Sequence, residues 1–126
     1  MQKGKSFCEM EEDEMRYATD KVIINGSAMY GFKLPETEGF AECISSEILE
    51  LILNFSNAEL TLAEVLLALR FNTAYNFKWP SGNLIAKVPI EGNQFNSYFL
   101  SGCISNYLDY RNHLVRRLKN IIAGHE

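Results

Sequence analysis

The chain has 126 residues, of which 47% are hydrophobic and 22% charged, and this composition is that of one ordinary globular domain rather than a disordered chain. The net charge of −4 argues against a broadly basic nucleic-acid-binding protein, because such affinity comes mainly from neutralised phosphates. No apolar run approaches the roughly 20 residues that span a bilayer, and the acidic N-terminus lacks the apolar stretch of a signal peptide.

The three cysteines, Cys8, Cys43 and Cys103, are widely spaced and form no CxxC pair. An odd number of cysteines without metal-ligand spacing argues against a disulfide framework and against a zinc module. We therefore expect reduced thiols and a soluble, cytoplasmic protein that has no membrane partner.

Acidic residues dominate the first segment of the chain. Five acids fall between Glu9 and Glu14, and residues 1–20 show no apolar periodicity. Mutual repulsion of these charges predicts a flexible acidic N-terminal arm over 1–20, with a partner-binding arm as the alternative. A single globular domain is then expected over 21–126.

Two segments carry signals for β-structure. In 21–34, β-prone residues flank Asn25 and Gly26, a pair that suits the positive φ angles of a two-residue hairpin turn. Residues 84–90 form a short apolar run between turn residues, and Pro89 restricts such a strand to a sheet edge. Together these segments predict a small antiparallel sheet.

Three segments have the apolar period of an amphipathic helix. The first begins at Thr37, a suitable N-cap, and runs to about Phe55. The second begins with Thr61 and Glu64 at capping-box spacing and is expected to continue toward Tyr75.

The third predicted helix is the longest and runs from about Asn96 to Ala123. Gly102 could interrupt it, and Gly124 stands where a C-terminal stop is expected. Its apolar side is expected to hold Leu100, Cys103, Tyr107, Leu114, Val115, Leu118, Ile121 and Ile122. The predicted fold is therefore α+β and mainly helical, with about three helices and the long C-terminal helix packed on a small antiparallel hairpin and edge strand. The alternative is an all-α bundle.

Few residues suggest catalysis or metal binding. Cys43 lies in the first turns of a predicted helix, but a thiol nucleophile also needs a histidine, and only His113 and His125 are present. Asp109 and His113 have i, i+4 spacing, which could supply half a metal site but is more typical of a weak surface ion pair. Phosphate-binding glycine loops are absent from the sequence. We predict no catalytic, metal or cofactor-binding residue and, with enzymatic activity left open, favour a protein that is not an enzyme.

Nine of the fifteen aromatic residues fall between positions 71 and 110, together with six asparagines. Phe71 lies about 200° around its helix from Leu69, outside the apolar stripe, so some ring area is left over. Tyr and Trp combine an apolar body with a polar tip and concentrate at interfaces. Ordinary core and a small-molecule pocket are the alternatives to a partner surface. The predicted partner-binding residues are Phe71, Tyr75, Phe77, Trp79, Tyr98, Tyr107 and Tyr110.

Basic residues gather on the last predicted helix and form a possible basic patch, made of Arg111, Arg116, Arg117 and Lys119. Arg111 and Arg117 are six residues apart and point to different sides, so the four residues do not make a single stripe. They are either solvated charges that complete a helix end, or a docking site for an acidic partner or for RNA phosphates.

These observations favour a small, acidic, non-enzymatic protein-interaction module of the intracellular inhibitor, immunity or adaptor type. Its partner would be another protein or, in a homodimer, a second copy of the chain, bound through the aromatic, asparagine-rich surface. Two alternatives stay open. One is a nucleic-acid-associated regulator that uses the basic C-terminal helix, and the other is a protein with a small-molecule-binding pocket.

Overall fold

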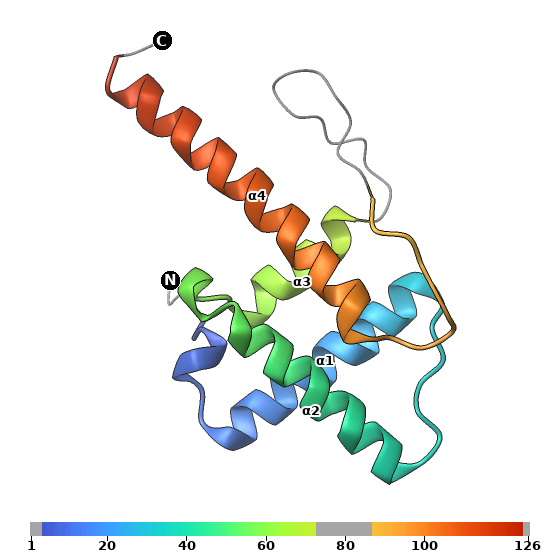
Figure 1. The fold of residues 1–126 in the computed structure, drawn as a ribbon. Helices are drawn as coiled ribbons and strands as arrows, with labels where there is room; N and C mark the ends of the chain where they lie inside the picture. Colours follow the sequence, from blue (N-terminus) through green and yellow to red (C-terminus); the bar gives the residue numbers. More distant parts are fainter. Residues whose placement is uncertain (1–3, 73–86, 125–126) are drawn as a thin grey trace.

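The structure, a computed structural model, describes residues 4–72 and 87–124, and this part of the chain is all-α (Figure 1). The predicted α+β fold is wrong, because no strand forms within these two ranges, and the all-α alternative fits. The elements in chain order are the 3₁₀ helix η1 (Phe7–Glu9), α1 (Glu12–Tyr30), α2 (Glu38–Asn54), the 3₁₀ helix η2 (Ser56–Ala58), α3 (Leu62–Phe71) and α4 (Ser97–Ile122).

Helix α1 includes residues 21–30 of the predicted hairpin of 21–34, and residues 31–34 follow its end. The expected turn, Asn25 and Gly26, lies in the interior of this helix. A Cβ atom on Gly26 would come within 2.4 Å of the Phe95 ring, so the glycine lets this ring pack directly on the backbone of α1. The local turn signal is therefore overridden by tertiary packing, which offsets the roughly 1 kcal/mol that glycine costs inside a helix.

Residues 4–20, which the sequence assigned to a flexible acidic arm, contain a buried anchor and the first turns of α1. Phe7 is 1% exposed, and its backbone N–H donates to the Leu60 carbonyl at 2.8 Å. The Glu14 carboxylate accepts from the backbone N–H of Glu11 and forms an ion pair with Lys5 at 3.2 Å. The acidic residues stand at the positive end of the helix dipole, where negative charge is favourable.

Helices α2 and α3 begin where the sequence predicted. The Thr37 hydroxyl accepts from the backbone N–H of Phe40, and the Thr61 hydroxyl accepts from that of Glu64, both at 3.2 Å. Both N-caps are thus confirmed. Helix α3 ends at Phe71, and the expected continuation toward Tyr75 lies outside the described residues.

Helix α4 is continuous through Gly102, where a break was considered. Its N-cap is Asn96, whose side chain accepts from the Phe99 backbone N–H at 2.9 Å. A Cβ atom on Gly102 would meet the Val88 side chain at 2.7 Å, so the glycine makes room for the segment that leads into the helix. Gly124 follows the helix with a φ angle of +78°, as expected for a C-terminal stop.

The predicted edge strand of 84–90 is not present in its described part. Residues 87–90 lie outside any regular element, while 84–86 fall outside the described residues. The Asn72 side chain accepts from the Val88 N–H at 2.8 Å and donates to its carbonyl at 3.2 Å. A buried amide thus satisfies the backbone groups that a neighbouring strand would have paired.

The core lies where the four helices meet. Helix α3 packs mainly on α4, and α1 packs on both α2 and α3. Aliphatic side chains fill the centre, and four rings pack with tilted or edge-on geometry at one end: Tyr30, Phe32, Phe95 and Phe99. No helix in 4–72 or 87–124 combines the length and apolarity that crossing a bilayer requires.

Candidate protein-interaction surface

Helix α4 has two halves with different surroundings. In the proximal half, Phe99, Leu100, Cys103 and Ile104 are buried in the core. In the distal half every residue of 114–124 is exposed, and Figure 1 shows this half projecting beyond the other helices. The helix therefore carries a long extension that the described part of the chain does not cover.

The distal half nevertheless has an apolar face. Five large aliphatic side chains are between 44% and 77% exposed, and we call this set the distal stripe: Leu114, Val115, Leu118, Ile121 and Ile122. The spacing of i, i+1, i+4, i+7 and i+8 places them side by side on one face. Single exposed apolar residues are common on protein surfaces, whereas large contiguous apolar patches are uncommon on monomers and are often functional.

The distal stripe continues the face that the proximal half buries. Leu118 follows Leu100 by 18 residues, which is about five helical turns, so the two side chains point in the same direction. Leu100 is fully buried, and Leu118 is 57% exposed. The stripe therefore faces the side of α4 on which the rest of the domain lies.

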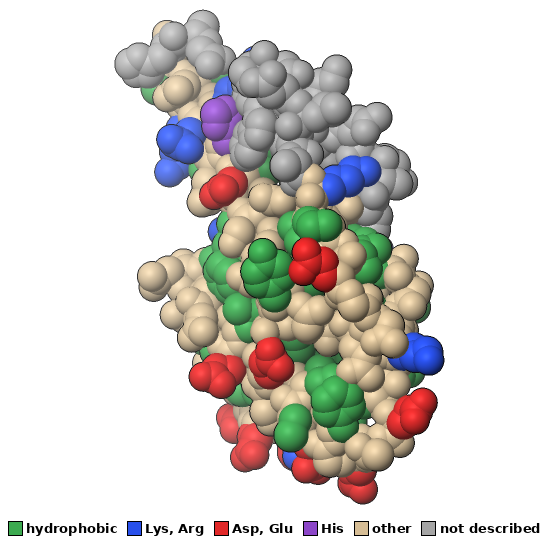
Figure 2. Space-filling model, turned by 45° about the vertical axis from the view of Figure 1, so that its right-hand side comes forward, with side chains coloured by type: hydrophobic (Ala, Val, Ile, Leu, Met, Phe, Trp, Pro, Cys, Tyr) green, Lys and Arg blue, Asp and Glu red, His purple; other side chains and the backbone are tan. Residues whose placement is uncertain are grey.

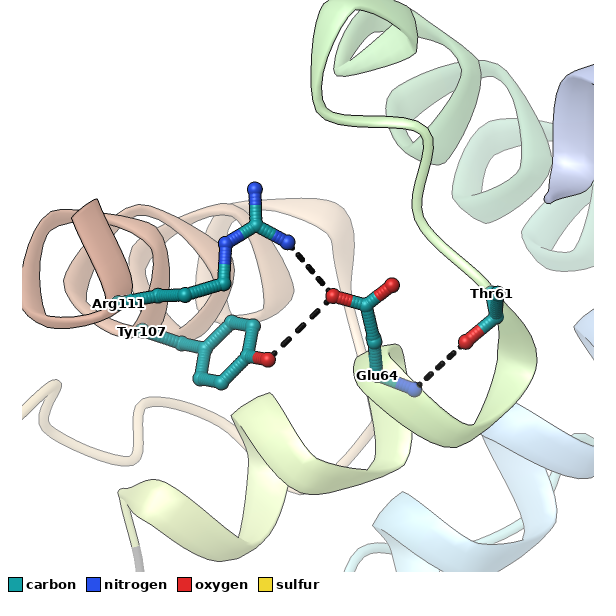
Figure 3. A network of polar contacts seen from close by, with 4 residues as sticks. All are labelled: Thr61, Glu64, Tyr107 and Arg111. Carbon is teal, nitrogen blue, oxygen red and sulfur yellow. Dashed lines mark hydrogen bonds and ion pairs between the residues drawn. The ribbon is translucent and has the colours of Figure 1, made fainter. Parts of the chain in front are cut away.

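A polar network marks the end of the covered face (Figure 3). The Arg111 guanidinium donates to Glu64 Oε2 at 2.6 Å, and the Tyr107 hydroxyl lies 3.4 Å from the same oxygen. The backbone N–H of Glu64 donates to the Thr61 hydroxyl, which caps the start of α3. Burial first, and the nearby Glu64 charge second, raise the pKa of Tyr107. These contacts fix α4 against α3 one turn before the distal stripe begins.

The predicted basic patch is divided by this network. Arg111 forms an ion pair with Glu64 near the middle of α4, and the other three members of the patch lie farther along, on the exposed distal half: Arg116, Arg117 and Lys119. Arg117 and Lys119 stand about 100° to either side of Leu118, and Arg116 lies behind them. The distal stripe is thus bordered by cations on both sides.

Charge is segregated along the molecule. Residues 1–59 carry five basic and twelve acidic groups, net −7, while residues 60–126 carry seven and four, net +3. On the face in Figure 2, carboxylates gather toward the end of the molecule away from distal α4. An open groove of about 490 Å³ between α1 and α2 belongs to this acidic end, and Glu12, Asp20, Glu38 and Glu42 contribute to its lining.

The residues of the predicted aromatic site do not form one surface among the described residues. Phe71 and Tyr107 are buried, and Tyr110 packs on the Phe71 ring at a centroid distance of 5.1 Å, so these three rings join α3 to α4. Tyr98 is 74% exposed in the first turn of α4. Tyr75, Phe77 and Trp79 lie outside the described residues, and the partner-binding role of the whole set stays a prediction.

The thiol and phenol groups of the core are held in protonated form. Burial raises the pKa of Cys103 to about 12, and it also raises the pKa of Tyr30 to about 12. The Tyr30 hydroxyl donates to the Leu69 carbonyl at 2.6 Å, which joins α1 to α3. Within 4–72 and 87–124, no three His, Cys, Asp or Glu side chains are grouped so as to hold a metal ion.

The residues of the distal stripe were predicted to lie on the apolar side of the last helix, but their exposure was not predicted. Its residues fit the period of the last helix, and that period alone does not show whether a neighbour covers it. The available signal was length, because α4 has 26 residues and α3 only 10, which correspond to about 39 Å and about 15 Å. A short helix that crosses a long one leaves part of the long helix uncovered.

Comparison with known proteins found no relative of this chain. The chain matches no protein-family model, and no match was found among curated proteins or among solved structures.

Proposed function

We propose that this chain is a non-enzymatic protein-interaction module of the inhibitor, immunity or adaptor type, and that the distal stripe is its docking surface. The observation that carries the proposal is a row of five large aliphatic side chains exposed on a projecting helix. Covering a half-exposed aliphatic side chain contributes about 1 kcal/mol, so a partner that covers all five gains several kcal/mol before the costs of association.

The way in which α4 is held supports this proposal. The proximal half is packed in the core, and the ion pair of Arg111 with Glu64 fixes the helix just before the stripe begins. A stripe on a pre-formed helix binds with less loss of conformational entropy than a segment that must fold on its partner. The surface is therefore organised before a partner arrives.

The nucleic-acid alternative has weaker support. Three cations lie on the distal half, but Arg116 points away from the side on which Arg117 and Lys119 border the stripe. The apolar stripe occupies the face between these two residues, where a phosphate backbone would gain nothing from aliphatic side chains. The arrangement favours a protein surface.

The test is capture of the tagged full-length chain from its native cells, followed by mass measurement of what stays bound. Leu118→Glu places a charge in the stripe, and Asn120→Glu places the same charge on the opposite side of the same exposed turn. We expect the wild-type chain and Asn120→Glu to retain the same partner and Leu118→Glu to lose it.

Circular dichroism and the melting temperature of both variants should stay near those of the wild-type chain, because both positions are exposed. Equal retention of the partner by Leu118→Glu and Asn120→Glu would contradict the proposal. Recovery of the wild-type chain as a lone monomer would contradict it as well.

A further inference from the structure

We infer that the partner surface which covers the distal stripe is an acidic amphipathic helix that packs lengthwise against α4. This inference rests on the proposed function and specifies the chemistry of the partner. It is carried by the spacing of the stripe, by the direction in which it faces and by the charges on its two sides.

The spacing is that of helix-on-helix packing. Tyr107, Arg111, Leu114, Leu118 and Ile121 follow one another at alternating steps of four and three, which is the a/d pattern of a helical seam. Glu64 of α3 already contacts the first two positions, so one helix of the domain uses the beginning of this seam. The last three positions offer the same repeat to a second helix.

The direction in which the stripe faces favours a single helix as the partner over a lipid surface. Leu118 is in phase with the buried Leu100, so the stripe faces the side on which α3 and the rest of the domain lie. A lipid surface that approached this side would meet α3 before it reached the stripe. A helix is only about 10 Å wide, so it is narrow enough to follow the axis of the projecting half.

The charges select an acidic partner. Arg117 and Lys119 border the stripe, Arg116 adds a third cation, and α4 contains no acidic residue after Asp109. Pairing of two α4 helices from two copies would bring like charges together, which costs free energy and selects against the wrong partner. A helix with carboxylates beside its apolar seam meets these cations favourably.

The length of the stripe sets the scale of the contact. Nine residues from Leu114 to Ile122 rise about 13 Å along the helix axis, which is between two and three turns. A contact of this size lies at the small end of specific interfaces, where charge contributes strongly to selectivity. We therefore expect moderate affinity and a clear dependence on salt.

The experiment measures binding of the full-length chain to three labelled synthetic peptides by fluorescence anisotropy. Each peptide is about three heptads long with the same leucine and isoleucine seam, and the flanking positions carry glutamate, glutamine or lysine. We expect the glutamate peptide to bind at least ~10-fold more tightly than the lysine peptide, with the glutamine peptide between them. The difference should shrink as salt is added.

Three variants sharpen this test. Leu118→Glu should abolish binding of the glutamate peptide. The double variant Arg117→Glu with Lys119→Glu should reverse the order and favour the lysine peptide, while Arg116→Glu, farther from the stripe, should keep the original order. Circular dichroism of each variant checks that the helix is intact.

Three outcomes would overturn the inference. Equal binding of the three peptides would show that the stripe has no preference for an acidic partner. Stripe-dependent binding to vesicles of equal parts phosphatidylcholine and phosphatidylserine, tighter than to the glutamate peptide, would assign the stripe to a lipid surface. Dimerisation of the wild-type chain in sedimentation equilibrium, lost in Leu118→Glu, would assign it to a second copy.

These results are separable from failure of the proposed function. If the cellular partner is lost in Leu118→Glu while the peptides show no charge preference, the docking surface stands and the acidic-helix inference fails. If the cellular partner is retained in Leu118→Glu, the docking surface itself is wrong, whatever the peptides show.

Discussion

The proximal and distal halves of α4 present the same helix face to different surroundings. Leu100 is fully buried and Leu118 is 57% exposed, although five turns of one helix place them in line. The apolar period is similar in both halves, and the difference is that α3 crosses only the first. The apolar period of a helix therefore shows which of its faces is apolar. Whether that face is buried within the same chain depends on which other elements pack against it.

The largest expected effect is the loss of stability in Leu100→Ala, which is compared with the same truncation at Leu118. Leu100→Ala leaves a cavity in a filled core and should lower the free energy of unfolding by about 2–5 kcal/mol. Leu118→Ala removes an exposed side chain and should change this free energy by less than about 0.5 kcal/mol. Urea unfolding followed by circular dichroism measures both, and similar losses for the two variants would show that the distal half is covered in the isolated chain.

A second comparison tests the packing that leads into the proximal half. Gly26→Ala would place its Cβ atom 2.4 Å from the ring of Phe95, so we expect a loss of about 1–3 kcal/mol in the free energy of unfolding. Gly39→Ala is the matched control, because nothing lies within 4 Å of its Cβ position in α2. Alanine is the better helix former, so this variant should be neutral or more stable by up to about 1 kcal/mol. Stabilisation by Gly26→Ala would refute the close approach of Phe95.

The polar network at the boundary between the halves should contribute a smaller amount. Glu64 and Arg111 have side chains 27% and 31% exposed, so solvent weakens their attraction, and we expect a coupling free energy of about 0.5–1.5 kcal/mol. A double-mutant cycle of Glu64→Gln and Arg111→Met, measured by urea unfolding, gives this value. Additive effects of the two substitutions would show that the ion pair does not fix α4 against α3.

The smallest effect concerns the pH dependence of the proximal half. Burial raises the pKa of the Cys103 thiol from 9.0 to about 12, so the folded state keeps a proton that the unfolded state releases above about pH 9. Stability should therefore be intact below pH 9 and fall as pH rises toward 12, by about 1 kcal/mol between pH 8 and pH 10. The raised pKa values of Tyr30 and Tyr107 act in the same direction at higher pH.

Cys103→Ala provides the comparison for this pH profile. The substitution lowers stability overall because it leaves a small cavity, but the decline between pH 8 and pH 10 should become shallower. Urea unfolding at several pH values measures the slope. An unchanged slope in the variant would show that the Cys103 thiol titrates in the folded chain as it does in the unfolded one.

Local signals were sufficient to locate α2, α3 and α4 among the α-helices of residues 4–72 and 87–124. Thr37, Thr61 and Asn96 are polar caps followed by apolar residues at helical spacing, and each of these features acts within one or two turns. The remaining helix, α1, was predicted as a flexible arm followed by a hairpin. Its glycine at position 26 is explained by Phe95, a residue nearly seventy positions away, and no local pattern reports such a contact.

The candidate site was less predictable than the fold. The sequence showed that aromatic residues gather in one region, but it could not show that Phe71 and Tyr107 are buried between helices while Leu118 is exposed. Arg111, one member of the predicted basic patch, forms an ion pair with Glu64. Because Glu64 belongs to a different helix, the local sequence around Arg111 could not show this pairing. Surfaces depend on which elements lie across one another, and this is a property of the whole fold.

One measurement tests directly whether the distal stripe binds a partner. The amount of the partner retained from native cells should be determined for Leu118→Glu relative to Asn120→Glu. Both variants add one negative charge to the same exposed turn of α4. We predict at least ~10-fold less retained partner for Leu118→Glu. Equal amounts from two equally folded variants would contradict the claim that this face of α4 is where the protein binds.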